Sequence, residues 1–159
     1  MRLIDYFIDD IIFIREVITK IDELELNIEK LQDTLNIKIN NSCRKAENSG
    51  FEKDIVQQAL FAIIAYFDEL ILCSKWKDKN QWQKQSLQRK YFSTSNMGSL
   101  FYERLNTLDK TEQSEWIREV YVLILGLGFK GRYFSADDQR ILSDIKEFNI
   151  GLLIPEQSQ

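Results

Sequence analysis

Apolar residues recur every three or four positions along most of the chain, which is the spacing that places them on one face of an α-helix. Polar or glycine-containing segments separate the periodic stretches. The pattern therefore predicts an all-α fold of about seven helices, and without an internal repeat or a low-complexity linker we expect one domain over residues 1–159. The expected helices cover residues 3–21, 22–48, 51–74, 75–90, 96–108, 112–127 and 135–148.

The pattern also assigns sides to individual positions near the two ends of the chain. In the first helix Asp10 falls among the polar residues and is expected on the solvent side. In the second helix Leu24 begins the inward face, and in the last helix Ile141 lies on the inward face with Leu142 and Ile145.

The most apolar stretch, residues 55–73, is apolar on nearly every side, which is typical of a helix inside a core or a membrane. Two adjacent carboxylates, Asp68 and Glu69, interrupt it. They point about 100° apart on a helix, so they cannot form a side-by-side pair. Each would cost roughly 2.5–3.5 kcal/mol in a membrane span. Because buried carboxylates are usually paired, at least one should meet a partner from elsewhere in the chain.

Residues 75–90 contain six basic residues and one acid, interleaved with Trp76 and Trp82. Such a mixture occurs in proteins that bind nucleic acid or an anionic membrane surface. Charge runs are also common on the surfaces of ordinary helices. We favour this second interpretation: a short polar helix whose tryptophans pack inward and whose lysines are solvated.

An apolar run at residues 120–125 is followed by G-x-G-x-x-G at Gly126, Gly128 and Gly131. This order is that of a dinucleotide-binding fingerprint. That fingerprint should open a helix inside a βαβ unit, but residues 132–134 intervene before Ser135 can cap a helix, and no βαβ alternation precedes it. We therefore interpret the segment as a helix end with glycine caps and a tight turn.

The composition narrows the chemistry further. Apolar residues make up 44% and charged residues 29% of the chain, as in soluble globular proteins. The net charge of −4 argues weakly against a nucleic-acid binder. The absence of histidine removes the usual general base and the commonest metal ligand. Cys43 and Cys73 are too few for a zinc motif. We predict no catalytic residue, no cofactor and no metal site.

Two sequence blocks resemble the DotU/TssL family, inner-membrane components of type VI secretion systems. The first block is the apolar helix with its carboxylates and two tryptophans: Ala62, Ala65, Asp68, Glu69, Leu72, Trp76 and Trp82. The second block contains the glycine segment: Glu119, Tyr121, Leu125, Gly126, Gly128, Phe129, Gly131, Arg132 and Tyr133. The sequence departs from the pattern between the blocks, with Ser99 where an acid is frequent and Tyr102 where a phenylalanine is common.

The resemblance implies a hook-like cytoplasmic domain of two small helical bundles with a cleft between them, followed by one C-terminal membrane helix. It implies a structural task and no enzyme activity. The implied partners are an IcmF/TssM-like inner-membrane protein, an outer-membrane lipoprotein and baseplate components. Self-association is expected mainly through the membrane anchor. The apolar residues after position 148 are too few to span a bilayer, so we expect the chain to be the soluble part of a longer protein at the inner membrane.

The family's acidic pair corresponds to Asp68 and Glu69. Two roles remain open for it: satisfying buried polar groups where the bundles meet, or forming part of a partner-binding surface. We also hypothesise that Arg132, the cation of the glycine turn, reaches one of the two carboxylates, since arginine is the preferred buried partner of a carboxylate. The remaining motif residues are expected to pack: Trp76, Trp82, Gly126, Gly128, Phe129, Gly131 and Tyr133.

Two other functional classes stay open. A generic helical adaptor or membrane-surface protein would use the basic and aromatic residues 75–90. A nucleotide-dependent enzyme would rest on Gly126, Gly128 and Gly131 alone.

Overall fold

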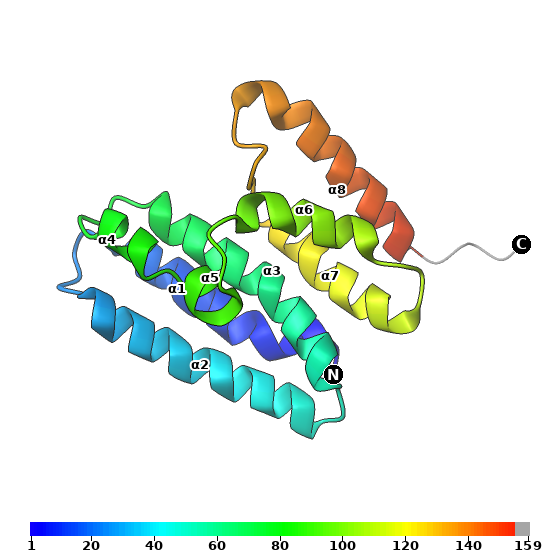
Figure 1. Cartoon of the computed structure of the whole chain (residues 1–159), viewed down its shortest axis with the longest axis horizontal. Helices are drawn as coiled ribbons and strands as arrows, with labels where there is room; N and C mark the ends of the chain where they lie inside the picture. Colours follow the sequence, from blue (N-terminus) through cyan, green and yellow to red (C-terminus); the bar gives the residue numbers. More distant parts are fainter. Residues whose placement is uncertain (155–159) are drawn as a thin grey trace, which may run out of the picture.

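The computed structural model describes residues 1–154, and over this range the chain is helical without a β-strand (Figure 1). The predicted all-α fold is therefore confirmed. The prediction of one domain over residues 1–159 includes residues 155–159, which lie outside the described part. The elements are the 3₁₀-helix η1 (Leu3–Phe7), α1 (Ile8–Thr19), α2 (Ile28–Asn48), α3 (Lys53–Leu72), α4 (Lys79–Lys84), α5 (Leu87–Phe92), α6 (Met97–Thr107), α7 (Glu112–Gly126), the 3₁₀-helix η2 (Ala136–Asp138) and α8 (Gln139–Leu153).

Helix α3 is the centre of the fold, as its apolar composition predicts. It packs against α1, α2, α4, α5, α6 and α7. Thirteen of its 20 residues are buried, including Asp68. Within residues 1–154, α3 is the one helix long and apolar enough to cross a membrane, but 72% of its most apolar window is buried inside the protein. Burial on this scale by the protein's own helices is what a core helix requires.

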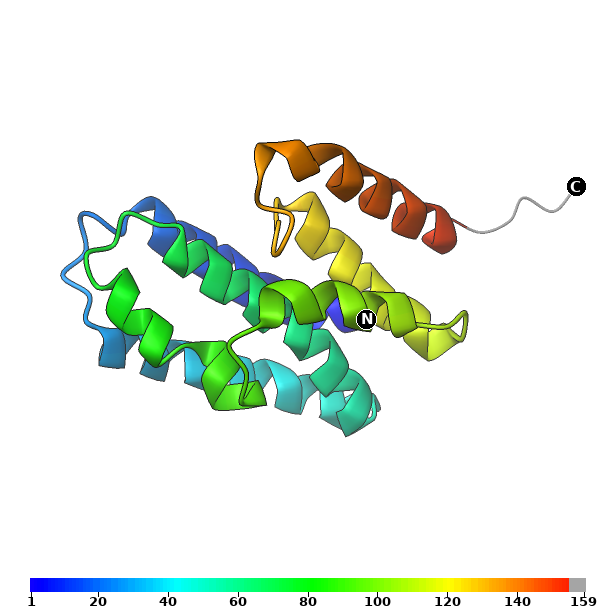
Figure 2. The same cartoon turned by 45° about the horizontal axis from the view of Figure 1, so that its top comes forward.

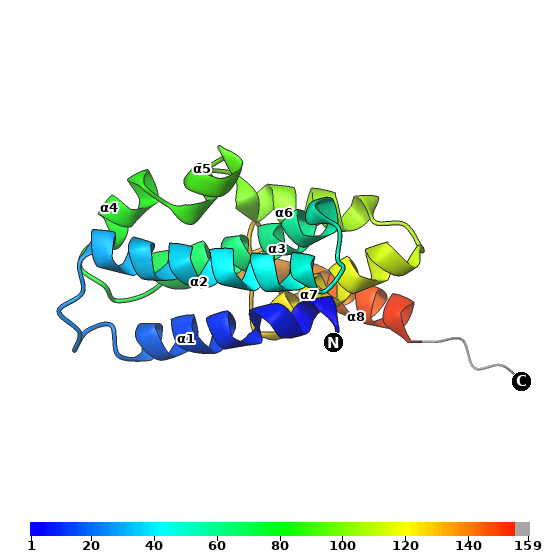
Figure 3. The same ribbon diagram turned by 90° about the horizontal axis from the view of Figure 1, so that it is seen from below.

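The helices form two groups that share α3. In the first group η1, α1 and α2 run along one side of α3, and α4 and α5 cover another (Figures 1 and 3). The Ser42 hydroxyl of α2 donates a hydrogen bond of 2.5 Å to the Asp10 carboxylate of α1. This contact joins the two outer helices of the group.

In the second group α6 and α7 pack against α3, and α8 packs on α7 (Figure 2). Figure 1 shows α8 on the far side of α7 from α3, at the edge of the molecule. The buried guanidinium of Arg118 on α7 donates to Asn149 of α8 at 2.6 Å. The same guanidinium donates to the carbonyl of Leu108 at 3.0 Å, so one side chain fixes α8 and the loop before α7.

Several predicted boundaries were wrong, each for a local reason. The second helix begins at Ile28, not residue 22, because the Asn27 side chain accepts from the Lys30 amide at 2.7 Å and caps it there. Residues 75–90 form two helices, because Ser86 starts α5 by accepting from the Arg89 amide. The last helix continues to Leu153. Eight α-helices therefore stand in residues 1–154 where about seven were expected.

Three side-chain assignments were also wrong. Asp10 is buried, because Ser42 of the neighbouring helix supplies the polar partner that allows it. Leu24 lies 40% exposed, in the loop that precedes the Asn27 cap. Ile141 is 47% exposed, because α8 has one principal neighbour, α7, and can bury one narrow face only.

Candidate functional site

Asp68, in the last third of α3, holds the segment that contains α4 and α5. Its side chain is 1% exposed. Oδ1 accepts from the Trp82 indole at 2.9 Å and from the Leu87 amide at 3.1 Å, and Oδ2 accepts from the Gln88 amide at 2.8 Å. These amides belong to the first turn of α5, where backbone N–H groups lack partners within the helix. The carboxylate therefore serves as the polar partner of both the indole and the helix start.

Glu69 points to a different part of the chain, as the predicted 100° separation requires. Oε2 accepts from the Lys130 amide at 3.0 Å and Oε1 accepts from the Gly131 amide at 2.8 Å. Two successive backbone N–H groups thus bind the two oxygens of one carboxylate. This contact attaches the turn after α7 to α3, across 61 and 62 positions of sequence.

The turn itself is shaped by two glycines. At the end of α7 the amide of Gly128 donates to the Leu125 carbonyl and the amide of Phe129 donates to the Ile124 carbonyl. With φ of +107° at Gly128, this is a Schellman cap. The glycine motif is accordingly a helix end, as interpreted from the sequence, and no strand precedes it in the described part of the chain.

Gly131 makes the close approach that brings this turn to α6. Its φ is +57°, and a Cβ added there would lie 2.5 Å from the carbonyl oxygen of Gly98. The amide of Arg132 donates to that same oxygen at 3.0 Å. A side chain at position 131 would displace the backbone of α6, so the contact requires glycine for both conformation and space.

A cluster of aromatic rings lies behind the turn. Phe129 packs on Phe101 with ring centroids 4.4 Å apart, and Tyr133 meets Tyr102 edge to face at 4.6 Å. The Tyr102 hydroxyl donates to the Lys130 carbonyl at 2.5 Å. The tyrosine that departs from the family pattern therefore adds a hydrogen bond to the turn that a phenylalanine would lack.

The hypothesis that Arg132 pairs with Asp68 or Glu69, the carboxylate doublet of α3, is wrong. Within residues 1–154 the one ion pair joins Arg2 to Glu119. The Arg132 guanidinium instead lies over the rings of Tyr133 and Tyr102, 5.0 and 5.5 Å from their centroids. The carboxylate oxygens to which this arginine was expected to donate accept hydrogen bonds from backbone N–H groups instead.

Both tryptophans of the first block pack inward. Trp82 is fully buried and Trp76 is 3% exposed, with ring centroids 6.0 Å apart. The exposed lysines of this segment are Lys75, Lys77, Lys84 and Lys90, and Lys79 is partly buried. The segment therefore has inward tryptophans and solvated lysines.

The electrostatics of the doublet follow from burial. Removal from water raises the pKa of Asp68 to about 6, against the opposing effect of its three N–H donors. Burial also raises the pKa of Glu69, and the amides of Lys130 and Gly131 oppose that rise. All four carboxylate oxygens accept hydrogen bonds from the chain itself. The two carboxylates thus hold α5 and the turn after α7 against α3.

Sequence reasoning missed two buried polar residues of comparable importance, Arg118 and Asp10. Arg118 is 4% exposed, and its partners are an asparagine and two backbone carbonyls. The signal for Arg118 was weak: on its helix face polar Ser114 and Glu115 precede it, and only the following positions, Tyr121, Val122 and Leu125, favour burial. No signal distinguished Asp10 from its exposed neighbours.

Comparisons with known proteins agree with this architecture. The family model of the type VI secretion system protein DotU matches residues 2–152. Among solved structures, the chain is similar to the cytoplasmic domain of TssL from Acinetobacter baumannii, with a TM-score of 0.78 and 22% sequence identity over 96% of this chain and 99% of that chain. At this identity the likeness shows a shared fold. No curated protein matches the sequence.

Proposed function

The chain belongs to the type VI secretion system DotU family, whose model covers nearly all of it, and from this premise we propose that it is a structural component of the membrane complex of that system. The resemblance drawn from the two sequence blocks is confirmed by the match. The observation that carries the proposal is this match over residues 2–152.

We propose that the domain lies on the cytoplasmic face of the inner membrane and that a C-terminal helix outside this chain anchors it there. Its partners would be an IcmF/TssM-like inner-membrane protein and components of the baseplate. The TssL structure of similar fold is described as a cytoplasmic domain, which supports this placement. The packing of six other helices against α3 suits a part that transmits position from one partner to another.

We propose a structural role for Asp68 and Glu69 within this scaffold. Each carboxylate binds N–H groups of a segment distant in sequence, α5 in one case and the turn after α7 in the other. Glu69 thereby connects α3 to the second group of helices. Partner binding would depend on Asp68 and Glu69 because these side chains hold the two segments in position.

We further propose that the domain performs no catalysis. The chain has no histidine, and the glycines that resemble a nucleotide motif form a helix cap and a tight turn. The polar groups gathered at the doublet are satisfied by one another, which leaves no free nucleophile or base at that place.

A pull-down with the cytoplasmic region of the IcmF-like protein tests the proposal. Three forms of the domain are compared: wild type, Glu69→Gln, and Glu103→Gln as a matched control on the exposed face of α6. Wild type and control are expected to retain the partner equally, and Glu69→Gln is expected to retain less. Failure of the folded wild-type domain to retain either the IcmF-like region or a baseplate component would refute the proposal.

The exposed lysines of residues 75–90 favour one alternative, a domain that binds an anionic membrane surface through this segment. Salt-sensitive sedimentation with phosphatidylserine vesicles, lost on changing Lys75, Lys77 and Lys84 to Glu, would favour it. Equal sedimentation of wild type and the triple variant would exclude it.

A further inference from the structure

The turn after α7 carries two cations, Lys130 and Arg132, on either side of Gly131. Arg132 is exposed and Lys130 is partly buried. The backbone of Arg132 is fixed, because its amide donates to the Gly98 carbonyl at 3.0 Å. The Arg132 side chain, in contrast, makes no ion pair and donates no hydrogen bond within residues 1–154. Its N–H groups are therefore available to an acceptor from outside the described chain.

Aromatic rings restrain both cations. The Arg132 guanidinium lies 5.0 Å from the ring centroid of Tyr133 and 5.5 Å from that of Tyr102. The Lys130 ammonium lies 5.2 Å from the ring centroid of Phe134. Ring faces attract such cations, and a side chain that is already restrained loses less conformational freedom when it binds a partner. The turn thus presents a guanidinium that is oriented before binding.

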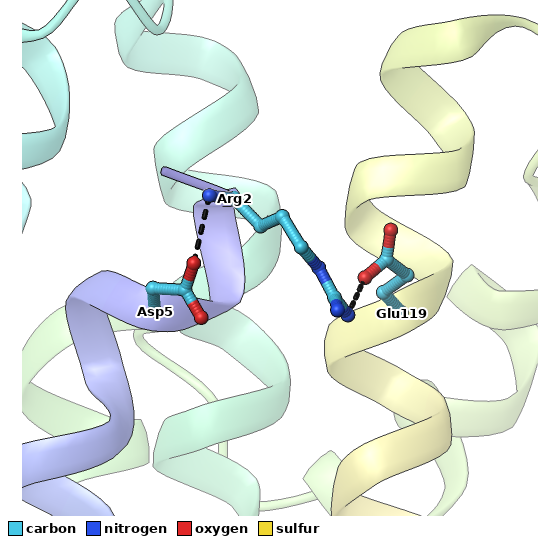
Figure 4. Close-up of polar contacts among 3 residues, drawn as sticks. All are labelled: Arg2, Asp5 and Glu119. Atoms are coloured by element: carbon cyan, nitrogen blue, oxygen red, sulfur yellow. Dashed lines mark hydrogen bonds and ion pairs between the residues drawn. The ribbon is translucent and has the colours of Figure 1, made fainter.

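Neither cation is paired with a carboxylate of the described residues. Within residues 1–154 the one ion pair joins Arg2 to Glu119 (Figure 4). Glu69 reaches the turn, but both its oxygens accept from backbone amides there. Asp137 and Asp138 follow in η2 and form no ion pair with either cation. At residues 128–134 two cations therefore stand against the single carboxylate of Glu69, which leaves a net positive charge at the turn.

We propose that this turn binds an acidic segment of a partner protein, with a carboxylate of the segment paired to Arg132 and an apolar side chain packed on Phe134. The planar guanidinium matches a carboxylate through two parallel hydrogen bonds, and Phe134 is 58% exposed beside it. Anionic membranes are bound by clusters of about four to eight cations, so two cations favour a protein partner. The inference deepens the proposed function and rests on it for the existence of a partner.

The test titrates short peptides into the folded domain. The acidic probe is acetyl-Gly-Glu-Glu-Phe-Gly-amide, and acetyl-Gly-Gln-Gln-Phe-Gly-amide is its neutral control of the same length. Binding is followed by ¹H–¹⁵N NMR at the Arg132 Nε–H and at the Phe134 amide. The acidic peptide is expected to shift both signals with saturation, and the neutral peptide is not. Because the chain has a net charge of −4, general attraction works against the acidic peptide, and saturable binding reports the turn.

Variants assign the binding to named side chains. Arg132→Gln is expected to weaken the acidic peptide roughly threefold or more. Arg132→Lys keeps the charge but loses the paired N–H groups, so its affinity should fall between those of wild type and Arg132→Gln. Phe134→Ala should weaken the acidic peptide as well. Arg44→Gln, at an exposed arginine of α2, is the matched control and should bind as wild type does. All three side chains are exposed, so each variant should fold.

Four results would overturn the proposal. Equal binding of the acidic and neutral peptides would mean an apolar contact without charge pairing. An effect of Arg132→Gln no larger than that of Arg44→Gln would mean non-local attraction. Inorganic phosphate that shifts the Arg132 Nε–H as far as the peptide does, at equal concentration, would mean a general anion site.

The fourth result concerns lipid. Sedimentation with phosphatidylglycerol vesicles that Arg132→Gln abolishes would assign the turn to a membrane surface instead. Each of the four results would leave the role in secretion standing, because deletion of the gene and its complementation test that role separately.

Discussion

Replacing Glu69 by glutamine changes one atom of the side chain and removes its ability to bind two donors. The carboxylate accepts from the Lys130 amide with Oε2 and from the Gly131 amide with Oε1. A glutamine can accept with its carbonyl oxygen only. Its NH₂ group would then face the second backbone N–H, and two donors would oppose each other.

The expected cost can be worked from this geometry. A hydrogen bond to a charged group contributes about 1.5–3 kcal/mol, and one is lost outright while the other becomes a weaker neutral bond. Neutralising the half-buried carboxylate offsets part of this loss, since burial raises its pKa and disfavours its charged form. We expect a net destabilisation of about 2 kcal/mol, which for a protein of this size lowers Tm by roughly 4–8 °C.

Thermal unfolding and hydrogen exchange give two independent readings. Glu69→Gln should lower Tm and should speed exchange at the amides of Lys130 and Gly131, because local protection follows the stability of the contact. Glu103→Gln makes the same chemical change on the exposed face of α6 and should leave both readings within experimental error.

Unchanged exchange at Lys130 and Gly131 in the Glu69→Gln variant would refute the reasoning, even if Tm fell. That result would mean that the two amides are protected by something other than the carboxylate. An unchanged Tm together with fast exchange would mean that the turn contributes nothing to global stability.

Three further predictions concern the other parts of the fold. Gly131→Ala should destabilise by at least about 1–2 kcal/mol in thermal unfolding, from the left-handed φ and the 2.5 Å approach to the Gly98 oxygen, whereas Gly126→Ala, with no atom near its Cβ, should be neutral or stabilising. Burial raises the pKa of Asp68 from 3.8 to about 6, so the contribution of Asp68 to stability is greatest below about pH 4 and is lost as pH rises through about 6. In denaturant titrations, the difference in free energy of unfolding between wild type and Asp68→Asn should shift against wild type by up to about 3 kcal/mol over that pH range. A difference that stays constant with pH would contradict the pKa assignment. Arg118→Met should speed hydrogen exchange throughout α8 and leave α1 unchanged, because the lost guanidinium joins α8 to α7; equal protection in both proteins would show that apolar packing alone holds α8.

The hydrophobic pattern was sufficient to predict the core. Residues 55–73 are so apolar that burial was the one stable outcome in water, and the helix they form is central. The same pattern failed where burial depends on one polar contact: Asp10 is accepted in the core because Ser42 happens to face it. Side-chain periodicity carries no information about which polar partner a neighbouring helix will present.

Asp68 and Glu69 also have partners that the sequence pattern could not identify. The sequence predicted that Asp68 and Glu69 point to different places and that partners come from elsewhere, but it suggested Arg132 as a partner. The actual partners are backbone amides together with the Trp82 indole. Every residue except proline carries a backbone N–H, so the letters of the sequence do not mark which ones a turn will expose. The sequence pattern indicated Arg132 because it is a charged side chain, whereas the backbone amides that bind the carboxylates leave no mark in the pattern.

Genetic complementation tests the central claim most directly, namely that this chain is a structural part of a type VI secretion system. The gene is deleted in its host, and type VI secretion into the medium is measured with the deletion complemented by wild type, Glu103→Gln or Gly131→Ala. The account predicts loss of secretion on deletion, restoration by wild type and Glu103→Gln, and reduced restoration by Gly131→Ala. Undiminished secretion from the deletion strain would contradict it.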